Sequence, residues 1–244
     1  MEDKLKIIFE NESYAVLDKA SGITVNRSDT TAEETTLQDL IEKENMINKS
    51  DVESDFINRS GIVHRLDKET SGVIIVAKNS KAFKIIQAQF KERQVEKTYI
   101  ALVHGEIKPQ TGEINVPVGR LPWNRKRFGI LAGGREAATW YQTISNFKYP
   151  ISNGTMTLVR LYPKTGRTHQ IRVHLKYIGH PIFGDVLYGG RKTARSDRKI
   201  LSRMFLHAQS LSFFDPRTGE RVQFESQLPG ELKKFVDSLE KIVN

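Results

Sequence analysis

The 244-residue chain is 38% hydrophobic and 27% charged, an ordinary globular composition that excludes fibrous and collagen-like classes. It contains no cysteine, which excludes disulfides, thiolate metal sites and a cysteine nucleophile, and no apolar run approaches the ~20 residues of a membrane helix. The net charge of +9 is uneven, because residues 1–63 hold 7 Lys/Arg against 14 Asp/Glu whereas residues 64–244 hold 31 against 15. This asymmetry points to a polyanionic partner, nucleic acid above all, and the N-terminus lacks a secretory pattern, so a cytoplasmic enzyme or binding protein is expected.

The N-terminal part of the chain reads as short elements separated by polar turns. The predicted elements are strands over residues 5–9 and 14–17, a tight loop over 18–25, a helix from Leu37 to about Asn45, and an exposed loop over 48–58. Thr35 or Thr36 is the expected N-cap of the helix, whose apolar residues Leu37, Leu40 and Ile41 share one face.

The stretch over residues 61–78 joins a very polar loop to an apolar run. Residues 73–77 are continuously apolar and mostly β-branched, which predicts a buried central strand. The loop before them is flanked by Gly61 and Gly72 and holds seven polar residues, His64, Arg65, Asp67, Lys68, Glu69, Thr70 and Ser71. A loop this polar at the end of a buried strand is a typical place for function.

The remaining elements alternate between strands and helices without a repeat or an evident linker. We expect a helix capped by Asn79 or Ser80, strands over residues 95–104, 113–118, 137–147, 155–162, 204–214 and 221–224, a helix opened by Thr168, and a last helix over 229–243. One α+β domain over residues 1–244, with a mixed and mostly antiparallel central sheet, is the simplest account.

Two basic loops suit an RNA partner. Residues 119–135 carry Arg120, Arg125, Lys126, Arg127 and Arg135 around Trp123 and Phe128. Cations beside exposed aromatic rings fit phosphates and unstacked bases, although a plain surface hairpin would give the same pattern. Residues 189–203 are a second basic stretch of this kind.

The helix opened by Thr168 predicts one specific ion pair. Ile171, Leu175 and Ile178 form its apolar face, and Arg172 lies at the edge of that face. An arginine held out of water needs a carboxylate, and Asp67 is a candidate that would thereby be kept ionised as a nucleophile or base. An ordinary structural ion pair is the alternative.

Two other kinds of site find less support in the residues. His169 and His174 are five positions apart and point in different directions on a helix, unlike helical zinc ligands, and no Gly-x-Ser-x-Gly elbow indicates a serine hydrolase. His64, His169 and His174 are expected to shape loops through hydrogen bonds.

Several motifs in order resemble those of RluA-type pseudouridine synthases. They are residues 18–22 (DKASG), 64–72 (HRLDKETSG), 97–105 (KTYIALVHG), 165–175 (TGRTHQIRVHL) and 206–208 (LHA) with Pro229. The first departs from the family pattern, which more often has proline where Ala20 stands. The matches run from about Lys6 to Phe235.

This resemblance implies isomerisation of uridine to pseudouridine in RNA, without cofactor or metal. Asp67 would be the catalytic aspartate, attacking the ribose or the uracil ring, Tyr99 would stack on the target base and accept its C5 proton, and Arg172 would pair with Asp67. The expected substrate contacts are His64, Arg65, Leu66, Arg167, His169, Gln170, Arg120, Arg125, Lys126 and Arg127.

The expected function is therefore a monomeric RNA pseudouridine synthase, of the compact type without an N-terminal RNA-binding domain. Large-subunit ribosomal RNA is preferred as substrate because of the broad basic surface. Transfer RNA is the alternative substrate, and a non-catalytic RNA-binding assembly factor is the alternative function.

Overall fold

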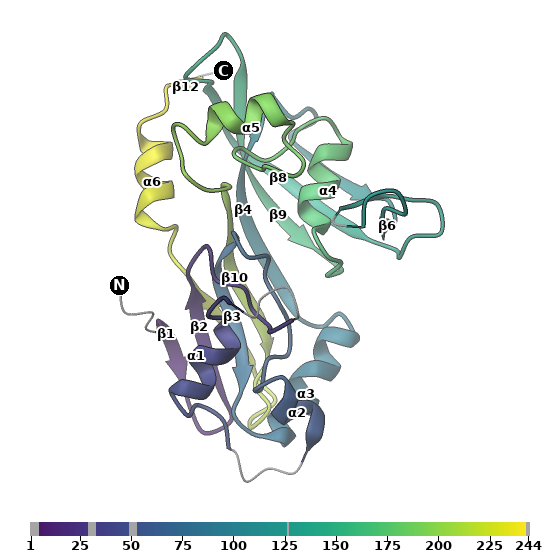
Figure 1. Cartoon of the computed structure of the whole chain (residues 1–244), viewed down its shortest axis with the longest axis vertical. Coiled ribbons are helices and arrows are strands. Elements are labelled where there is room, and N and C mark those ends of the chain that lie inside the picture. The colour runs from purple at the N-terminus through teal and green to yellow at the C-terminus, as the bar shows by residue number, and fades with distance from the viewer. Residues whose placement is uncertain (1–4, 29–32, 49–52, 126, 243–244) are drawn as a thin grey trace. The chain divides into compact units, whose positions relative to one another are not determined.

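The structure is a computed structural model that describes residues 5–28, 33–48, 53–125 and 127–242. The chain divides into two compact units, unit 1 with residues 1–96 and 208–227 and unit 2 with residues 97–207 and 228–244 (Figure 1). Within the described residues, no helix combines the length and the hydropathy needed to cross a membrane. A single catalytic domain stays a prediction, and the two units are described separately.

Unit 1 contains an antiparallel sheet with three helices. Its elements are β1 (Ile7–Glu10), β2 (Tyr14–Lys19), α1 (Leu37–Lys43), α2 (Ser54–Asn58), β3 (Ser71–Ala77), α3 (Ser80–Lys91), most of β10 (Leu206–Phe214) and β11 (Arg221–Glu225). The strand order is β1-β2-β3-β10, with β11 paired to β10. Every residue of β3 is buried, as its unbroken apolar run predicts, and α3 packs against it.

In unit 2, the sheet strands have a helix on each face. Its elements are β4 (Glu96–His104), β5 (Thr111–Asn115), β6 (Val118–Arg120), β7 (Phe128–Ile130), β8 (Ala138–Lys148), β9 (Thr155–Pro163), α4 (Gln170–Tyr177), α5 (Arg191–Asp197), α6 (Gly230–Asp237) and β12 (Lys241–Ile242). The strand order is β4-β9-β8-β12, β5 pairs with β8, and β6 pairs with β7 in a separate hairpin. Because side chains alternate along a strand, α4 packs on the face that holds Ala101 and Val159, and α6 on the face that holds Ile100 and Leu102.

The α+β class with a mostly antiparallel sheet is confirmed, and the long periodic elements lie where the sequence predicts them. Four stretches differ from expectation. The predicted loop over 48–58 contains α2, the basic stretch 119–135 contains the β6–β7 hairpin, the stretch 189–203 contains α5, and the last helix stops at Asp237 before β12. Elements of two to seven residues are too short to display a hydrophobic period.

Gly72 joins the polar loop to β3 at a position where a side chain cannot fit. Its φ is +116°, and a Cβ atom built on it would lie 2.1 Å from the carbonyl oxygen of Ala208 on β10. We therefore expect Gly72→Ala to lower the free energy of unfolding by at least about 2 kcal/mol in urea titrations. Gly219→Ala separates the cost of the positive φ from the cost of the steric clash, because Gly219 has φ +73° but open space around it. This substitution should lower the free energy of unfolding by only about 1 kcal/mol.

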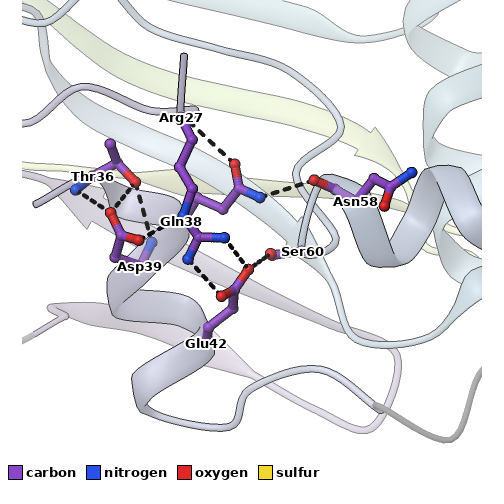
Figure 2. Close-up of polar contacts among 7 residues, drawn as sticks. All are labelled: Arg27, Thr36, Gln38, Asp39, Glu42, Asn58 and Ser60. Atoms are coloured by element: carbon purple, nitrogen blue, oxygen red, sulfur yellow. Dashed lines mark hydrogen bonds and ion pairs between the residues drawn. The ribbon is translucent and has the colours of Figure 1, made fainter. Parts of the chain in front are cut away.

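A polar network around Arg27 fixes α1 to the turn that leads into the polar loop (Figure 2). The Arg27 guanidinium donates to Asp39 at 2.6 Å and to Glu42 through both terminal nitrogens, and Glu42 also accepts from the Ser60 hydroxyl. Asp39 completes a capping box with Thr36, the residue predicted as N-cap. Figure 2 shows Gln38 extending the same network to the carbonyl of Asn58.

This network predicts acid sensitivity in unit 1. Burial raises the pKa of Glu42, but hydrogen bonds from Arg27 and Ser60 outweigh it and hold the pKa below the ordinary 4.5. A lowered carboxylate pKa means that the unfolded state binds more protons, so this stability is present above pH 4.5 and is lost as the pH falls through the folded value. Arg27→Gln should make the fall of Tm between pH 5 and pH 3 less steep. The contribution lost should be under about 1 kcal/mol of unfolding free energy, because the Arg27–Glu42 pair is partly exposed. An equally steep profile in this variant would contradict the assignment.

Candidate active site

Asp67 lies in a tight turn directly before β3. The Thr70 amide donates to the carbonyl oxygen of Asp67 at 3.0 Å, which closes the turn. Leu66 and Thr70 are buried on either side, whereas Asp67 is half-buried and Arg65 is exposed. The turn thus anchors its apolar residue in the core and leaves the carboxylate partly accessible.

His64 holds the start of this loop against β3 and α3. Its Nε2 accepts a hydrogen bond from the Ile75 amide at 3.1 Å, so the ring proton resides on Nδ1 when the side chain is neutral. The ring stacks on Phe90 with centroids 4.6 Å apart. These contacts agree with the predicted loop-shaping role, and a direct substrate contact by His64 stays a prediction.

Lys19, which the sequence analysis did not single out, joins the loop over residues 18–25 to the Asp67 turn. Its side chain is 2% exposed, and its ammonium donates to the carbonyls of Ala20 and Ile23 at 2.8 Å and of Lys68 at 3.1 Å. Two further hydrogen bonds join the same loops, from the Ser21 hydroxyl to the Glu69 carbonyl and from the Gly22 amide to the Lys68 carbonyl. A buried lysine at the end of β2, whose sequence is otherwise mostly apolar, is the signal that could have identified it.

We expect Lys19→Met to lower kcat with little effect on KM, because the Asp67 turn loses its cross-loop hydrogen bonds but no RNA contact. Three carbonyls would lose a charged donor, so unfolding stability should also fall by about 1–3 kcal/mol. Lys6→Met is a matched control, since Lys6 is 74% exposed and, among the described residues, pairs with Asp18 alone. If Lys19→Met has an unchanged kcat, the hydrogen bonds of Lys19 do not position Asp67.

Tyr99 and Arg172 both belong to unit 2 and lie on the same side of its sheet. Tyr99 is partly buried and packs against the cluster that contains Ile171 and Leu175 of α4. Arg172 follows Ile171 on that helix and is 5% exposed. The predicted apolar face of the helix is confirmed, with Ile178 packed on the same cluster.

Arg172 forms a buried bidentate ion pair with Asp185. Its Nε donates to Asp185 Oδ2 at 2.8 Å and its Nη2 to Oδ1 at 2.9 Å. The predicted need for a carboxylate is therefore met within unit 2 by Asp185, a residue that sequence reasoning missed although Gly184 and Gly189 mark a turn around it. A contact of Arg172 with Asp67 would join the two units and stays a prediction.

Tyr188 connects Arg172 to the basic hairpin β6–β7. The guanidinium carbon of Arg172 lies 5.0 Å from the centre of the Tyr188 ring. The Tyr188 hydroxyl contacts His169 Nδ1 at 2.9 Å and accepts from the Phe128 amide at 3.1 Å. Arg120 in turn lies over the Phe128 ring at 4.9 Å. Three residues predicted to serve the site, Arg120, His169 and Arg172, are thus brought together in unit 2.

The start of α4 differs from the predicted one. The helix begins after His169, which has φ +55° in the left-handed region, and Thr168 is not its N-cap. Gln170 is 4% exposed and all of its hydrogen-bonding capacity is used, toward Thr165, the Arg167 amide, Ala138 and Thr139. Gln170 therefore positions the loop, and its predicted contact with the substrate stays a prediction.

The other predicted RNA contacts lie on the surface of unit 2. Arg125 and Arg127 are exposed on the hairpin, and their side chains have no ion-pair partner among the described residues. Arg167 donates from Nε to the Glu136 carbonyl at 3.0 Å. Lys126 lies outside the described residues. Helix α5 adds three exposed cations, Arg191, Lys192 and Arg195, and Lys199 directly after it is exposed as well.

Known proteins match this chain over nearly its whole length. A family model described as RNA pseudouridylate synthase matches residues 13–177. An uncharacterized RNA pseudouridine synthase of Aquifex aeolicus is 40% identical over 243 residues, which is 97% of this chain and 73% of that protein. The ribosomal large subunit pseudouridine synthase D of Nitrosomonas europaea is 34% identical, over 98% of this chain and 66% of that protein.

A solved structure agrees with these matches. Human RNA pseudouridylate synthase domain containing 1 superposes with a TM-score of 0.74 at 28% identity, covering 98% of this chain and 89% of that chain. The chain therefore belongs to the RNA pseudouridylate synthase family, the enzymes that isomerise uridine to pseudouridine in RNA.

Proposed function

We propose that this enzyme modifies specific uridines of large-subunit ribosomal RNA and that Asp67 is its catalytic nucleophile. The observation that carries the catalytic part is the Asp67 turn, a half-buried carboxylate on a loop held by Lys19, His64 and Leu66. Rigid support of this kind is what a reacting side chain requires.

The reaction consumes no co-reactant, because the product is an isomer of the substrate. The N1–C1′ glycosidic bond breaks, the uracil turns so that C5 faces C1′, a C5–C1′ bond forms, and the C5 proton leaves to a base while N1 gains a proton. Asp67 would attack either C1′ of the ribose or the uracil ring to start this exchange. Tyr99 would stack on the extruded base and accept the C5 proton.

Substrate choice is proposed to depend on the cations of unit 2. Seven exposed cations there, Arg125, Arg127, Arg135, Arg191, Lys192, Arg195 and Lys199, lack an ion-pair partner among the described residues. Unpaired surface cations bind phosphates and release counterions. Ribosomal RNA is favoured over transfer RNA because two of the similar proteins are named ribosomal large subunit pseudouridine synthase D.

Pseudouridine mapping tests this proposal. RNA from cells with and without the gene would be compared, and purified enzyme would be added back to the unmodified RNA. Loss and restoration of a site in large-subunit ribosomal RNA is the expected result. A site lost only from transfer RNA would overturn the substrate assignment, and no lost site at all would favour a non-catalytic RNA-binding role.

A further inference from the structure

Lys97 occupies the face of the unit 2 sheet that also holds Tyr99. The two residues are separated by one position on β4, so their side chains point to the same side. That side is the one covered by α4, because Ala101 continues the alternation into the cluster of Ile171 and Leu175. The Lys97 ammonium is thus directed toward the loop that leads into α4, where it donates to the carbonyl of Thr165 at 3.3 Å.

The ammonium has fewer partners than its burial requires. It carries three donors, and among the described residues the Thr165 carbonyl is its one hydrogen-bond acceptor and no carboxylate lies within ion-pair distance. Burial alone lowers the pKa of Lys97 from 10.5 to about 8, with no opposing contribution from a nearby charge.

Several charged groups on the surrounding elements of unit 2 have partners other than Lys97. Lys164 pairs with Glu113 at 2.9 Å, Arg167 donates to the Glu136 carbonyl, and Arg172 pairs with Asp185. The nearby titratable rings are Tyr99 on the same strand, Tyr162 on β9 and His169 before α4, and His169 contacts Tyr188. None of these groups neutralises Lys97.

Lys97 is partly buried, and a desolvated cation without a counter-ion is costly unless a ligand supplies the negative charge. Gly166 leaves room for such a ligand, because a Cβ atom built there would meet no atom closer than Lys97 Nζ at 4.0 Å. The anion available to an RNA-modifying enzyme beside a base-stacking tyrosine is a phosphate of the RNA backbone. We propose that Lys97 binds an RNA phosphate adjacent to the target nucleotide, an inference that rests on the proposed role of Tyr99 in the site.

The test compares Lys97→Met and Lys97→Arg with the wild-type enzyme, using the RNA that pseudouridine mapping identifies. Lys97→Met should raise KM and the RNA Kd about tenfold with kcat at saturation unchanged, and should reduce the slope of log Kd against log salt by about 0.7. Wild-type affinity should fall from pH 7 to pH 9 as Lys97 loses its proton. Lys97→Arg should retain affinity over that range, because arginine stays charged.

Lys164→Met is the matched control, since Lys164 is close in sequence to the same loop, is 63% exposed and already pairs with Glu113. It should leave the pH profile of KM unchanged. A lower kcat with unchanged KM in Lys97→Met would overturn the inference and assign Lys97 to the chemical step. An unchanged KM, pH profile and salt slope would overturn it as well. Failure of the proposed function would look different, because the wild-type enzyme would then form no pseudouridine in large-subunit ribosomal RNA.

Discussion

Asp67→Asn is expected to abolish pseudouridine formation while the protein still folds. Asparagine keeps the size of the side chain but removes the negative charge and the nucleophilic oxygen. The turn itself should survive, because its hydrogen bond runs from the Thr70 amide to the backbone carbonyl of residue 67. Loss of a nucleophile costs on the order of 10⁶-fold in rate. Release of tritium from RNA labelled at uridine C5 measures this rate directly.

The control for this substitution is Asp55→Asn. Asp55 lies on α2 of the same unit, its side chain is 56% exposed, and its ion pair with Arg59 is long at 3.9 Å. It should retain full activity and stability. Tritium release by Asp67→Asn at more than about a tenth of the wild-type rate would remove Asp67 from the chemical step. Equal RNA affinity of the variant and the wild type would separate lost chemistry from lost binding.

Elements with a strong period or an unbroken apolar run could be predicted from the sequence. Strand β3 is buried at every residue and α3 is capped by Asn79, as the apolar run and the capping signal indicated. The five-residue helix α2 and the three-residue strands of the hairpin could not be predicted, because their formation depends on tertiary contacts such as that of Phe56 with Phe83.

The candidate site was predictable in its residue types but not in its supporting contacts. The burial of Arg172 and its need for a carboxylate followed from a helical wheel. The identity of that partner within unit 2, Asp185, depends on how the turn around Gly184 folds back onto α4, and no sequence period encodes this. Lys19 was missed for the same reason, because its three acceptors come from two separate loops.

The ion pair between Arg172 and Asp185 should be among the most strongly coupled pairs in the protein. Asp185 is fully buried and accepts from Arg172 twice and from the amides of Leu187 and Tyr188. Removing one partner leaves an uncompensated buried charge, which costs about 3–5 kcal/mol. Asp185→Asn and Arg172→Met should therefore each lower the free energy of unfolding by about that amount in urea titrations.

A double-mutant cycle turns this expectation into a measurement of coupling. The double variant Arg172→Met with Asp185→Asn contains no unpaired charge, so its loss of stability should fall short of the sum of the single losses by about 2–3 kcal/mol. Lys233 and Asp237 provide the control cycle, because this pair on α6 is also short, at 2.6 Å, but is 66% and 59% exposed. Its coupling should stay below about 0.5 kcal/mol.

The same variants connect stability to catalysis. If Asp185 directs the Arg172 guanidinium toward the reacting groups, Asp185→Asn should lower kcat at temperatures where the variant is fully folded, although the buried carboxylate is not exposed to RNA. The double variant should regain stability without regaining activity, because the guanidinium is gone. Recovery of both together would mean that the ion pair only holds α4 in place and that Arg172 has no part in the reaction.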